Sequence, residues 1–473
     1  MRRTKIICTL GPAVDSVEQI SALLREGMDG ARFNFSHGSH ESHAATLEKL
    51  RQASRETGIE VASILDTKGP EIRVRSFAKG FAELREGEVF TLRTDTVEGT
   101  DTEVSVTYAG LAEEIDPGNT VLLDDGLIRM TVEKIEGTRI LCRVQDGGIL
   151  KNNKSICLPD CDIDLPVLTE KDMDDLRFGA EQGFDFVAAS FVRSREDVRA
   201  IRRVLDSCGG EKIRIISKIE NRQGVNDLDG IIAESDGIMV ARGDLGVEIP
   251  AEEVPTVQKR MIRRARAAGK IVIVATQMLD SMIHNPRPTR AEVSDVANAV
   301  YDRTSCVMLS GETAGGSYPV ESLKTMVRIL LEAEKETCRW DPPEDTEETF
   351  RLETVSDAIT HTACVMARDL SAKAIVTATK SGFTARLVAR FCPPCPILAI
   401  TPEPTVCRQL NLCWGVQPEL CADTETTDEL FALCGEKSRE AGLADSGDTV
   451  VITAGIPMGR TGSTNLIKAE TLK

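Results

Sequence analysis

The chain has 473 residues, of which 41% are hydrophobic and 28% are charged, a composition typical of a globular protein of roughly two to four domains. Its net charge of −18 argues against a nucleic-acid-binding protein. No apolar run approaches the length of about 18 residues that suggests a membrane span. The 14 cysteines lack paired spacing, and the first apolar run is too short for a signal peptide, so we expect a cytoplasmic protein.

Short β-branched and apolar runs recur along the first two thirds of the chain, with helical stretches such as 17–26 and 252–268 between them. The strands expected from these runs are 4–9, 29–33, 61–65, 184–188, 214–219, 236–240, 270–275 and 306–309. Eight strands alternating with helices predict an α/β fold, a (β/α)8 TIM barrel. Polar residues follow the strands, at the end of such a barrel where active sites are built. They are Thr9, Asn34, Ser36, Asp66, Ser190, Lys218, Glu220, Asp244, Thr276 and Ser310.

The connection between the third and fourth strands is anomalous, because roughly 120 residues are far more than one helix and two loops need. Alternating segments at 89–92, 103–106, 120–123, 127–135 and 139–144 are separated by turn residues. This pattern predicts a small inserted β-barrel domain at 70–166 and leaves 1–69 and 167–340 to the large barrel. Both ends of the insert meet the barrel near Asp66, so we expect a lid that closes over the site.

An acidic, proline-bearing connector at 341–349 separates the barrel from a second α/β pattern. A helix at 354–369 and strands at 374–377, 397–400 and 449–453 predict a three-layer α/β domain with a parallel sheet at 341–473. Its segment 377–384 (TATKSGFT) offers Thr379, Lys380, Ser381 and Thr384 between a strand and a helix. Such a loop fits a phosphate, and it fits a plain helix N-cap equally well.

The segment 213–222 (IRIISKIENR) carries the most specific chemical pattern. Its β-branched run predicts a buried strand, and the two-residue period of a strand points Lys218 and Glu220 to the same side. A lysine beside a carboxylate at the end of a buried strand forms a structural ion pair or holds a ligand. The lysine suits a phosphate or an oxyanion, and the carboxylate suits Mg²⁺.

A second carboxylate follows in ARGDLG (241–246). Gly243 allows backbone amides to approach a ligand closely, and we expect this turn to lead through Pro250 into a helix. Glu220 and Asp244 are a candidate two-carboxylate Mg²⁺ site, although an Asp at a strand end is often a cap or turn residue.

Two further patterns favour structural roles. His37, His40 and His43 recur every three residues, and on a helix this spacing drifts around the face, so convergence on zinc is disfavoured. Cys392 and Cys395 form a lone C-P-P-C without a second pair, which predicts a tight loop. The chain has no GxxxxGK[ST] run, so a P-loop phosphotransferase is excluded.

Eight motifs in order resemble the pyruvate kinase family. They are 5–12 (KIICTLGP), 32–38 (RFNFSHG), 65–73 (LDTKGPEIR), 217–221 (SKIEN), 242–246 (RGDLG), 275–279 (ATQML), 285–290 (NPRPTR) and 309–314 (LSGETA). The resemblance spans nearly the whole chain, including the inserted lid and the C-terminal domain. It implies transfer of the phosphoryl group of phosphoenolpyruvate to ADP, giving ATP and pyruvate, in a homotetramer that uses Mg²⁺ and K⁺.

The resemblance also implies roles for individual residues. Lys218 and Arg32 resemble groups that stabilise the transferred phosphoryl group, with Thr276 and Ser310 relaying a proton through water. Gly243, Asp244 and Thr276 resemble the pocket for the pyruvate carboxylate. Glu220 and Asp244 resemble the Mg²⁺ ligands, and the residues that resemble the K⁺ site are Asn34, Ser36, Asp66 and Thr67. Asn34, His37 and Arg73 resemble nucleotide-binding residues, and the residues that resemble an activator loop for a phosphorylated sugar or nucleotide are Thr379, Lys380, Ser381 and Thr384.

Three positions bear on how closely the chain follows the family. Ser194 stands where many members carry a basic residue, and Arg303 stands where glycine is common in a turn. Glu71 accompanies K⁺ dependence in the family.

Two rival functions are left open by the sequence. A Mg²⁺-dependent lyase or aldolase on a similar barrel would act on pyruvate or phosphoenolpyruvate without a nucleotide, and a silent regulatory protein would have lost one of the groups named above.

Overall fold

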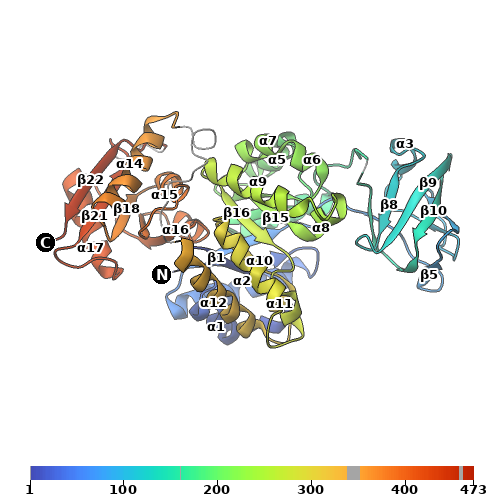
Figure 1. The fold of residues 1–473 in the computed structure, drawn as a ribbon, viewed down its shortest axis with the longest axis horizontal. Helices are drawn as coiled ribbons and strands as arrows, with labels where there is room; N and C mark the ends of the chain where they lie inside the picture. Colours follow the sequence, from blue (N-terminus) through green and yellow to red (C-terminus); the bar gives the residue numbers. More distant parts are fainter. Residues whose placement is uncertain (1, 160, 338–351, 458–461) are drawn as a thin grey trace.

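The computed structural model describes residues 2–159, 161–337, 352–457 and 462–473, so the connector at 341–349 and the expected domain limit at 340/341 lie outside these residues. Three bodies lie in a row in Figure 1, with the central barrel between the inserted domain and the C-terminal domain. None of the helices described has the length and apolar character needed to cross a membrane.

The central body is a closed barrel of eight parallel strands, as predicted. In barrel order they are β1 (Lys5–Thr9), β17 (Cys306–Leu309), β16 (Ile271–Ala275), β15 (Gly237–Ala241), β14 (Arg214–Ile219), β13 (Phe186–Ala189), β3 (Ala62–Asp66) and β2 (Gly30–Asn34). β14 and β17 have the expected bounds, and the ends of the other strands shift by at most two residues, because neither apolar pattern nor propensity fixes a terminal residue.

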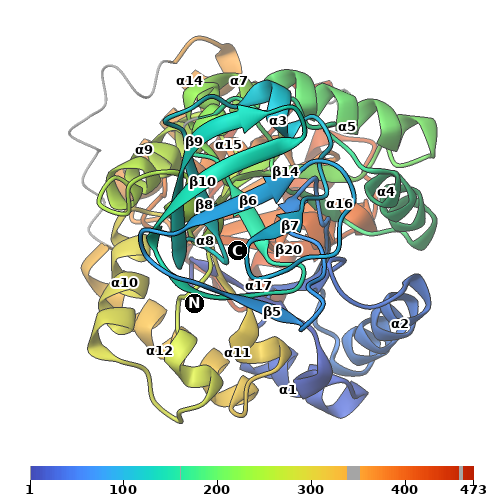
Figure 2. The ribbon, with the colours of Figure 1, turned by 90° about the vertical axis from the view of Figure 1, so that its right-hand side faces the viewer.

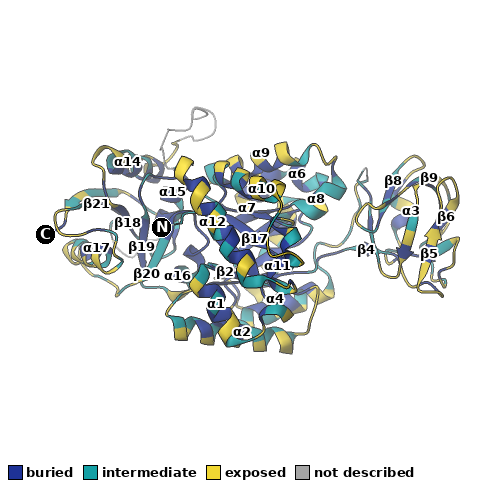
Figure 3. Ribbon diagram, turned by 60° about the horizontal axis from the view of Figure 1, so that its bottom comes forward, coloured by how far each residue is buried: buried dark blue, intermediate teal, exposed yellow. Residues whose placement is uncertain are grey.

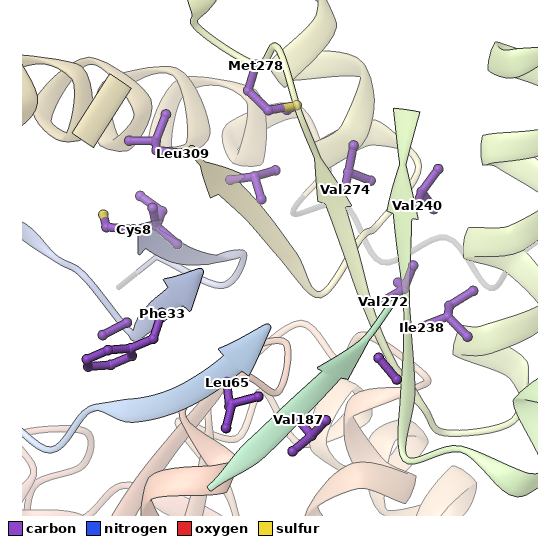
Figure 4. Close-up of a cluster of buried hydrophobic side chains, with 14 of the residues drawn as sticks. Cys8, Phe33, Leu65, Val187, Ile238, Val240, Val272, Val274, Met278 and Leu309 are labelled. Atoms are coloured by element: carbon purple, nitrogen blue, oxygen red, sulfur yellow. The ribbon is translucent and has the colours of Figure 1, made fainter. Parts of the chain in front are cut away.

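The two faces of each strand have different partners. Cys8, Phe33, Leu65 and other side chains of one face lie in the layer between the strands and the surrounding helices (Figure 4). The alternate residues, among them Ile64 and Ile216, fill the barrel and share one cluster with residues of the C-terminal domain. Each fully buried side chain of this size contributes about 1.5–3 kcal/mol. Two residues further on, the inward face presents Asp66 and Lys218, so the core register itself orients these groups.

Helices cover the outside of the barrel, with their exposed faces toward solvent (Figure 3). They include α1 (Val17–Glu26), α2 (His40–Thr57), α4 (Glu170–Gln182), α5 (Arg195–Ser207), α6 (Arg222–Asn226), α7 (Leu228–Glu234), α9 (Val254–Ala267), α10 (Arg290–Tyr301), α11 (Gly311–Ala314) and α12 (Pro319–Thr337). Ser194 caps α5 by accepting a hydrogen bond from the Asp197 amide, which gives this departure from the family a local structural role.

The segment after β15 corrects one expectation. The predicted turn over ARGDLG is itself a helix, α8 (Arg242–Glu248), which begins directly after the strand. Asp244 lies in its first turn, where a carboxylate is favoured by the helix dipole, so the sequence that suggested a turn is also compatible with a helix start.

The inserted domain is a seven-stranded sheet in the order β4 (Ile72–Arg73), β12 (Ser155–Cys157), β8, β9, β10, β6 and β7, with a separate pair formed by β11 (Gly148–Lys151) and β5 (Phe81–Leu84). A bridge between Val74 and Val106 joins the two edges of the sheet and closes the small barrel that was predicted. The expected segments correspond to β6 (Val89–Arg93), β7 (Glu103–Ser105), β8 (Thr120–Leu123), β9 (Ile128–Glu136) and β10 (Arg139–Asp146). Figure 2 shows this domain in front of the barrel mouth.

Four short strands of the insert escaped prediction: β4 (Ile72–Arg73), β5 (Phe81–Leu84), β11 (Gly148–Lys151) and β12 (Ser155–Cys157). Each has two to four residues, too few for an alternating pattern to stand out. The insert also contains one short helix, α3 (Leu111–Glu114).

The C-terminal domain has a five-stranded sheet in the order β20-β19-β18-β21-β22. Its strands are β18 (Ala374–Ala378), β19 (Ile397–Thr401), β20 (Val416–Leu420), β21 (Thr449–Ala454) and β22 (Leu466–Thr471), and its helices are α14 (Val355–Asp369), α15 (Phe383–Ala389), α16 (Pro404–Leu410) and α17 (Thr427–Glu440). The expectation of a parallel sheet is wrong at one edge, because β22 runs antiparallel to β21. β20 was missed because it contains Pro418, which an edge strand tolerates.

Arg303 is strained, as its position in the turn before β17 suggested. Its φ is 62°, in the left-handed region that only glycine enters freely. Relief of this strain predicts that Arg303→Gly raises the free energy of unfolding by about 1 kcal/mol. Urea denaturation of the two proteins measures the difference. Arg303→Ala is the matched control, since it removes the guanidinium but keeps the strained Cβ. Equal stability of the Gly and Ala variants would contradict a backbone origin.

Candidate active site

Lys218 lies at the centre of a compact polar group at the C-terminal ends of the barrel strands. Its Nζ is 2.9 Å from Glu220 Oε1 and 3.3 Å from Asp66 Oδ1, and it donates a hydrogen bond of 2.8 Å to Ser190 Oγ. Burial alone would lower the pKa of Lys218, but Asp66 and Glu220 outweigh burial and raise it. The lysine is therefore a fixed positive charge, and the predicted pairing of Lys218 with Glu220 is present.

Glu220 is fully buried, with one oxygen held by a backbone amide and the other facing Lys218. Oε2 accepts a hydrogen bond of 2.6 Å from the Phe191 amide, whereas Oε1 has no hydrogen-bond partner despite its ion pair with Lys218. Burial raises the pKa of Glu220 to about 7, Lys218 opposes this shift, and Asp244 adds to it. A carboxylate oxygen with unmet bonding capacity beside a second carboxylate is suited to a hard cation.

Asp244 faces this group from the first turn of α8. Burial raises its pKa, and Lys218 opposes the shift. The neighbouring Gly243 amide donates a bond of 2.8 Å to Thr276 Oγ1. Thr276 has a φ of 70°, so its hydroxyl is held beside the glycine by a strained backbone. The structure thus brings Gly243, Asp244 and Thr276 together.

Arg32, which lies on β2, contacts the same polar group through Asp66. Its Nε is 2.5 Å from Asp66 Oδ2, and its Nη1 donates a bond of 3.2 Å to Thr9 Oγ1. Burial would raise the pKa of Asp66, but Arg32 and Lys218 hold it below its usual value. Ser310 follows β17 and donates its amide to Glu312 Oε2 at 2.7 Å. Arg32 therefore shares a carboxylate with Lys218, while none of the hydrogen bonds among the described residues joins Ser310 to Lys218.

The four predicted K⁺ ligands come from two neighbouring strand ends. Asn34 and Asp66 are register partners in β2 and β3, and the Ser36 amide donates to Asn34 Oδ1 at 3.1 Å. Thr67 follows Asp66, and its carbonyl and hydroxyl oxygens accept bonds of 2.6 and 3.1 Å from Ser190. The four residues thus lie at adjacent strand ends, and the oxygens of Thr67 already accept hydrogen bonds from Ser190.

A cavity of about 230 Å³ lies between the inserted domain and the barrel. Glu71 and Arg73 line it near the start of the insert, and Arg73 donates to Glu71 Oε2 at 2.7 and 2.9 Å. Asp244 lines it from the barrel side, whereas Lys218 and Glu220 do not. The cavity therefore adjoins the polar group at Asp244 and is large enough to admit part of a small molecule.

The histidine segment packs as a structural unit. His40 Nε2 lies 2.7 Å from Asp175 Oδ1, and its ring stacks on Phe178. His43 Nε2 lies 2.9 Å from the His37 carbonyl, and its ring stacks on Phe35. The side chain of His37 is exposed, and the loop beneath it is braced by the other two histidines.

Sequence reasoning left several neighbours of the site unassigned. The Phe191 amide holds Glu220, and Phe191 has a φ of 55°. Its only sequence signal was its place just after a barrel strand, since a backbone donor carries no side-chain pattern. Arg193 donates to the carbonyls of Ile163 and Leu165 and so joins the end of the insert to the barrel.

The loop at 379–384 lines a cavity of about 70 Å³ in the C-terminal domain. Lys380 Nζ is 2.6 Å from Asp423 Oδ2, and Thr384 Oγ1 is 2.8 Å from Thr464 Oγ1. Thr379 and Ser381 line the same cavity. All four predicted effector residues thus meet here, although the buried hydroxyl of Thr384 already has a partner.

The same loop contacts the floor of the barrel. The Ser381 carbonyl accepts bonds of 3.1 Å from Arg214 and from Arg386. Arg214 begins β14, and its Nη1 lies 2.5 Å from Asp236 Oδ1 just before β15. The far ends of these two strands lead to Lys218, Glu220 and Asp244, so the loop is joined to the strands that position the site.

Comparison with known proteins agrees with this architecture. The family models "pyruvate kinase, barrel domain" and "pyruvate kinase, alpha/beta domain" match residues 1–323 and 357–469. A pyruvate kinase of Clostridium acetobutylicum is 46% identical over 474 residues, covering 100% of both chains. One of Geobacillus stearothermophilus is 48% identical, covering 100% of this chain and 80% of the relative.

A solved structure agrees as well. The crystal structure of a pyruvate kinase from Cryptosporidium parvum superposes with a TM-score of 0.94 at 39% identity, covering 100% of this chain and 96% of the other. These findings do not favour the lyase or aldolase alternative. The chain belongs to the pyruvate kinase family.

Proposed function

We propose that the polar group around Lys218 is the active site at which this chain transfers the phosphoryl group of phosphoenolpyruvate to ADP. The observation that carries the assignment is a buried, charged lysine flanked by Asp66 and Glu220 at the mouth of the barrel. The experiment is phosphorus NMR of the reaction mixture. Phosphorus from phosphoenolpyruvate should appear in the γ position of ATP, whereas a lyase would consume substrate without ADP.

The chemistry needs positive charge around the phosphoryl group as it leaves the enol oxygen and bonds to an oxygen of ADP. Lys218 supplies it as a point charge at the strand end, and Arg32 supplies planar donors from the neighbouring strand. Asp66 holds both cations, so they stay oriented between turnovers. These contacts stabilise the charge that builds up on the transferred oxygens.

Mg²⁺ fits the Glu220 and Asp244 carboxylates. Buried Glu220 Oε1, which has an ion pair but no hydrogen-bond partner, and the nearby Asp244 give two carboxylate ligands, which suits a cation that fills its other positions with water and phosphate oxygens. When bound, Mg²⁺ would neutralise charge on the phosphate oxygens. The Phe191 amide keeps Glu220 in place from the opposite oxygen.

The remaining enolate must gain a proton at carbon to become pyruvate. Gly243, Asp244 and Thr276 provide amides and a hydroxyl for the carboxylate of the substrate, and the Gly243 amide would exchange Thr276 Oγ1 for that ligand. Thr276 and Ser310 are the proposed relays, acting through water because a hydroxyl alone is a poor acid.

Asn34, His37 and Arg73 are proposed nucleotide contacts.

K⁺ is proposed to bind among Asn34, Ser36, Asp66 and Thr67. Glu71 places negative charge near Asp244, although Arg73 also pairs with Glu71. Its effect is seen in the pKa of Asp244, which burial raises most and which the charge of Glu71 raises further. We expect little activity when tetramethylammonium replaces K⁺ at constant ionic strength. Glu71→Lys should lower the K⁺ requirement because an ammonium can replace the ion, whereas the control Glu71→Gln should not. Full activity of the parent enzyme without K⁺ would contradict the proposal.

The loop at 379–384 is a proposed activator site for a phosphorylated sugar or nucleotide. Its contact with Arg214 offers a physical link to β14, as two states of different affinity require. Lys380→Gln should raise the half-activating concentration of fructose 1,6-bisphosphate about tenfold, the usual effect of losing one charged hydrogen bond. Activity at subsaturating phosphoenolpyruvate is the measurement, and Lys373→Gln is the control. A flat response of the parent to phosphorylated metabolites would exclude the site.

Three wider properties remain proposals. A homotetramer is the usual assembly of the family and would place the regulatory domains in contact with one another. The domain limits at 69/70, 166/167 and 340/341 follow the sequence pattern. A cytoplasmic location agrees with the lack of any disulfide among the described cysteines.

A further inference from the structure

The loop between β13 and α5 contacts both chain connections of the inserted domain. We call residues 190–193 the β13 loop. On the first connection, Gly69 has a φ of 73° and packs so closely that a Cβ there would lie 2.8 Å from side-chain atoms of the β13 loop. On the second connection, the carbonyls of Ile163 and Leu165 accept hydrogen bonds from Arg193. The two segments that carry the lid therefore meet the barrel at one loop.

Ile163 and Leu165 are shared between the insert and the barrel. Their side chains pack against the core of the inserted domain, whereas their carbonyls bind Arg193, with a distance of 2.9 Å from Nη1 to the Ile163 oxygen. The planar fork of a guanidinium suits two such acceptors. The Arg193 side chain is only 17% exposed, and Asp197 on α5 lies 3.6 Å from its Nε and accepts its amide at 2.8 Å. A shift of the insert must therefore move or break the bonds to Arg193.

The other end of the β13 loop contacts the polar group around Lys218. The Phe191 amide donates to Glu220 Oε2 at 2.6 Å, and Ser190 Oγ accepts from Lys218 Nζ at 2.8 Å. Phe191 has a φ of 55°, a conformation that persists only where the surrounding contacts impose it. The amide that orients Glu220 and the arginine that holds the insert are thus two residues apart on one loop.

We propose that Arg193 is a positioning residue, which fixes the β13 loop against the second connection and so keeps the Phe191 amide on Glu220. This inference rests on the proposed Mg²⁺ site. The hydrogen bonds and ion pair of Arg193 with the described residues go to Asp197 and to the two carbonyls of the connection, so it acts on Glu220 through the loop. When those carbonyls move away, the loop loses its support on one side and Glu220 loses its fixed orientation.

A second contact holds the same connection without involving the β13 loop. Gln223 on α6 donates to Asp162 Oδ1 at 2.9 Å. Asp162→Ala removes this bond and leaves the acceptors of Arg193 in place, since these are backbone carbonyls. It therefore separates a specific effect of Arg193 from the general effect of a loosened connection.

The experiment is backbone amide hydrogen exchange, followed by mass spectrometry of the enzyme without substrates or metal. Arg193→Gln should speed exchange about tenfold in peptides covering 161–165 and in peptides covering 190–193, the effect of losing one charge-assisted hydrogen bond. Arg193→Lys, which can still donate to one carbonyl, should give a smaller increase. Asp162→Ala should speed exchange at 161–165 alone.

The matched control is Arg195→Gln, because Arg195 is the neighbouring arginine and pairs with Asp227 on another helix end. Both segments should exchange in this variant as they do in the parent. Exchange at 190–193 that Arg193→Gln leaves unchanged, or that Asp162→Ala raises equally, overturns the proposal.

Titration of activity against Mg²⁺ is the second measurement. Arg193→Gln should raise the Mg²⁺ concentration for half-maximal activity roughly three- to tenfold, less than the loss of a group that touches the metal ligand itself, and Arg193→Lys should restore part of it. An unchanged Mg²⁺ titration also overturns the proposal. A parent enzyme without activity would refute the proposed function instead, and hydrogen exchange would still decide whether Arg193 supports the loop.

Discussion

Lys218→Met is expected to lower turnover by about 100- to 1000-fold, the effect of removing one preorganised electrostatic contact to a transition state. The fold should survive, because Asp66 keeps its ion pair with Arg32 and Glu220 keeps the Phe191 amide. Methionine preserves much of the side-chain volume, so the change isolates the charge. Steady-state kinetics at saturating phosphoenolpyruvate and ADP measure it.

The control for Lys218→Met is Lys212→Met, which removes a lysine with 79% exposed side chain just before the same strand. It should leave turnover unchanged. A Lys218→Met enzyme that works within tenfold of the parent would contradict the role of Lys218, provided that both variants unfold at similar urea concentrations.

Glu220→Gln and Asp244→Asn are each expected to raise the Mg²⁺ concentration needed for half-maximal activity by at least about tenfold, the loss typical even of outer-shell partners of a metal. A neutral amide is a poorer ligand for a hard cation than a carboxylate. The carbonyl oxygen of the introduced glutamine can still accept a hydrogen bond from the Phe191 amide, so the position of the group is kept. Titration of activity against Mg²⁺ measures the change.

The matched control for the metal site is Asp229→Asn, because Asp229 is an exposed carboxylate of α7 with 72% exposed side chain. Its Mg²⁺ response should equal that of the parent. If neither Glu220→Gln nor Asp244→Asn shifts the Mg²⁺ titration, the ligand assignment is wrong.

The barrel could be predicted because each of its strands carries its own recognisable sequence pattern. Each strand is a short apolar run buried on both sides, and the two-residue period carries on into Asp66 and Lys218 at the strand ends. The inserted domain was found from its length and turns, but the two-residue strand β4 and the proline-bearing β20 carry too little pattern. The direction of β22 depends on a tertiary contact with β21 that no local signal encodes.

The side chains of the candidate site could be proposed from the sequence, whereas its backbone contacts could not. The sequence identified Lys218, Glu220 and Asp244 by their chemistry, but it could not show that the Phe191 amide holds Glu220. Nor could it show that Arg73 pairs with Glu71, since the sequence related Arg73 to the nucleotide and Glu71 to K⁺ dependence. Ion pairs between neighbouring charges depend on rotamers, which the sequence does not determine.

The most direct measurement of the central claim is production of pyruvate from phosphoenolpyruvate, followed by coupling to NADH oxidation by lactate dehydrogenase. We predict that pyruvate forms only when ADP and Mg²⁺ are present, that K⁺ accelerates it, and that Lys218→Met suppresses it. Pyruvate formation that is independent of ADP, or no pyruvate formation with all components present, would contradict the account.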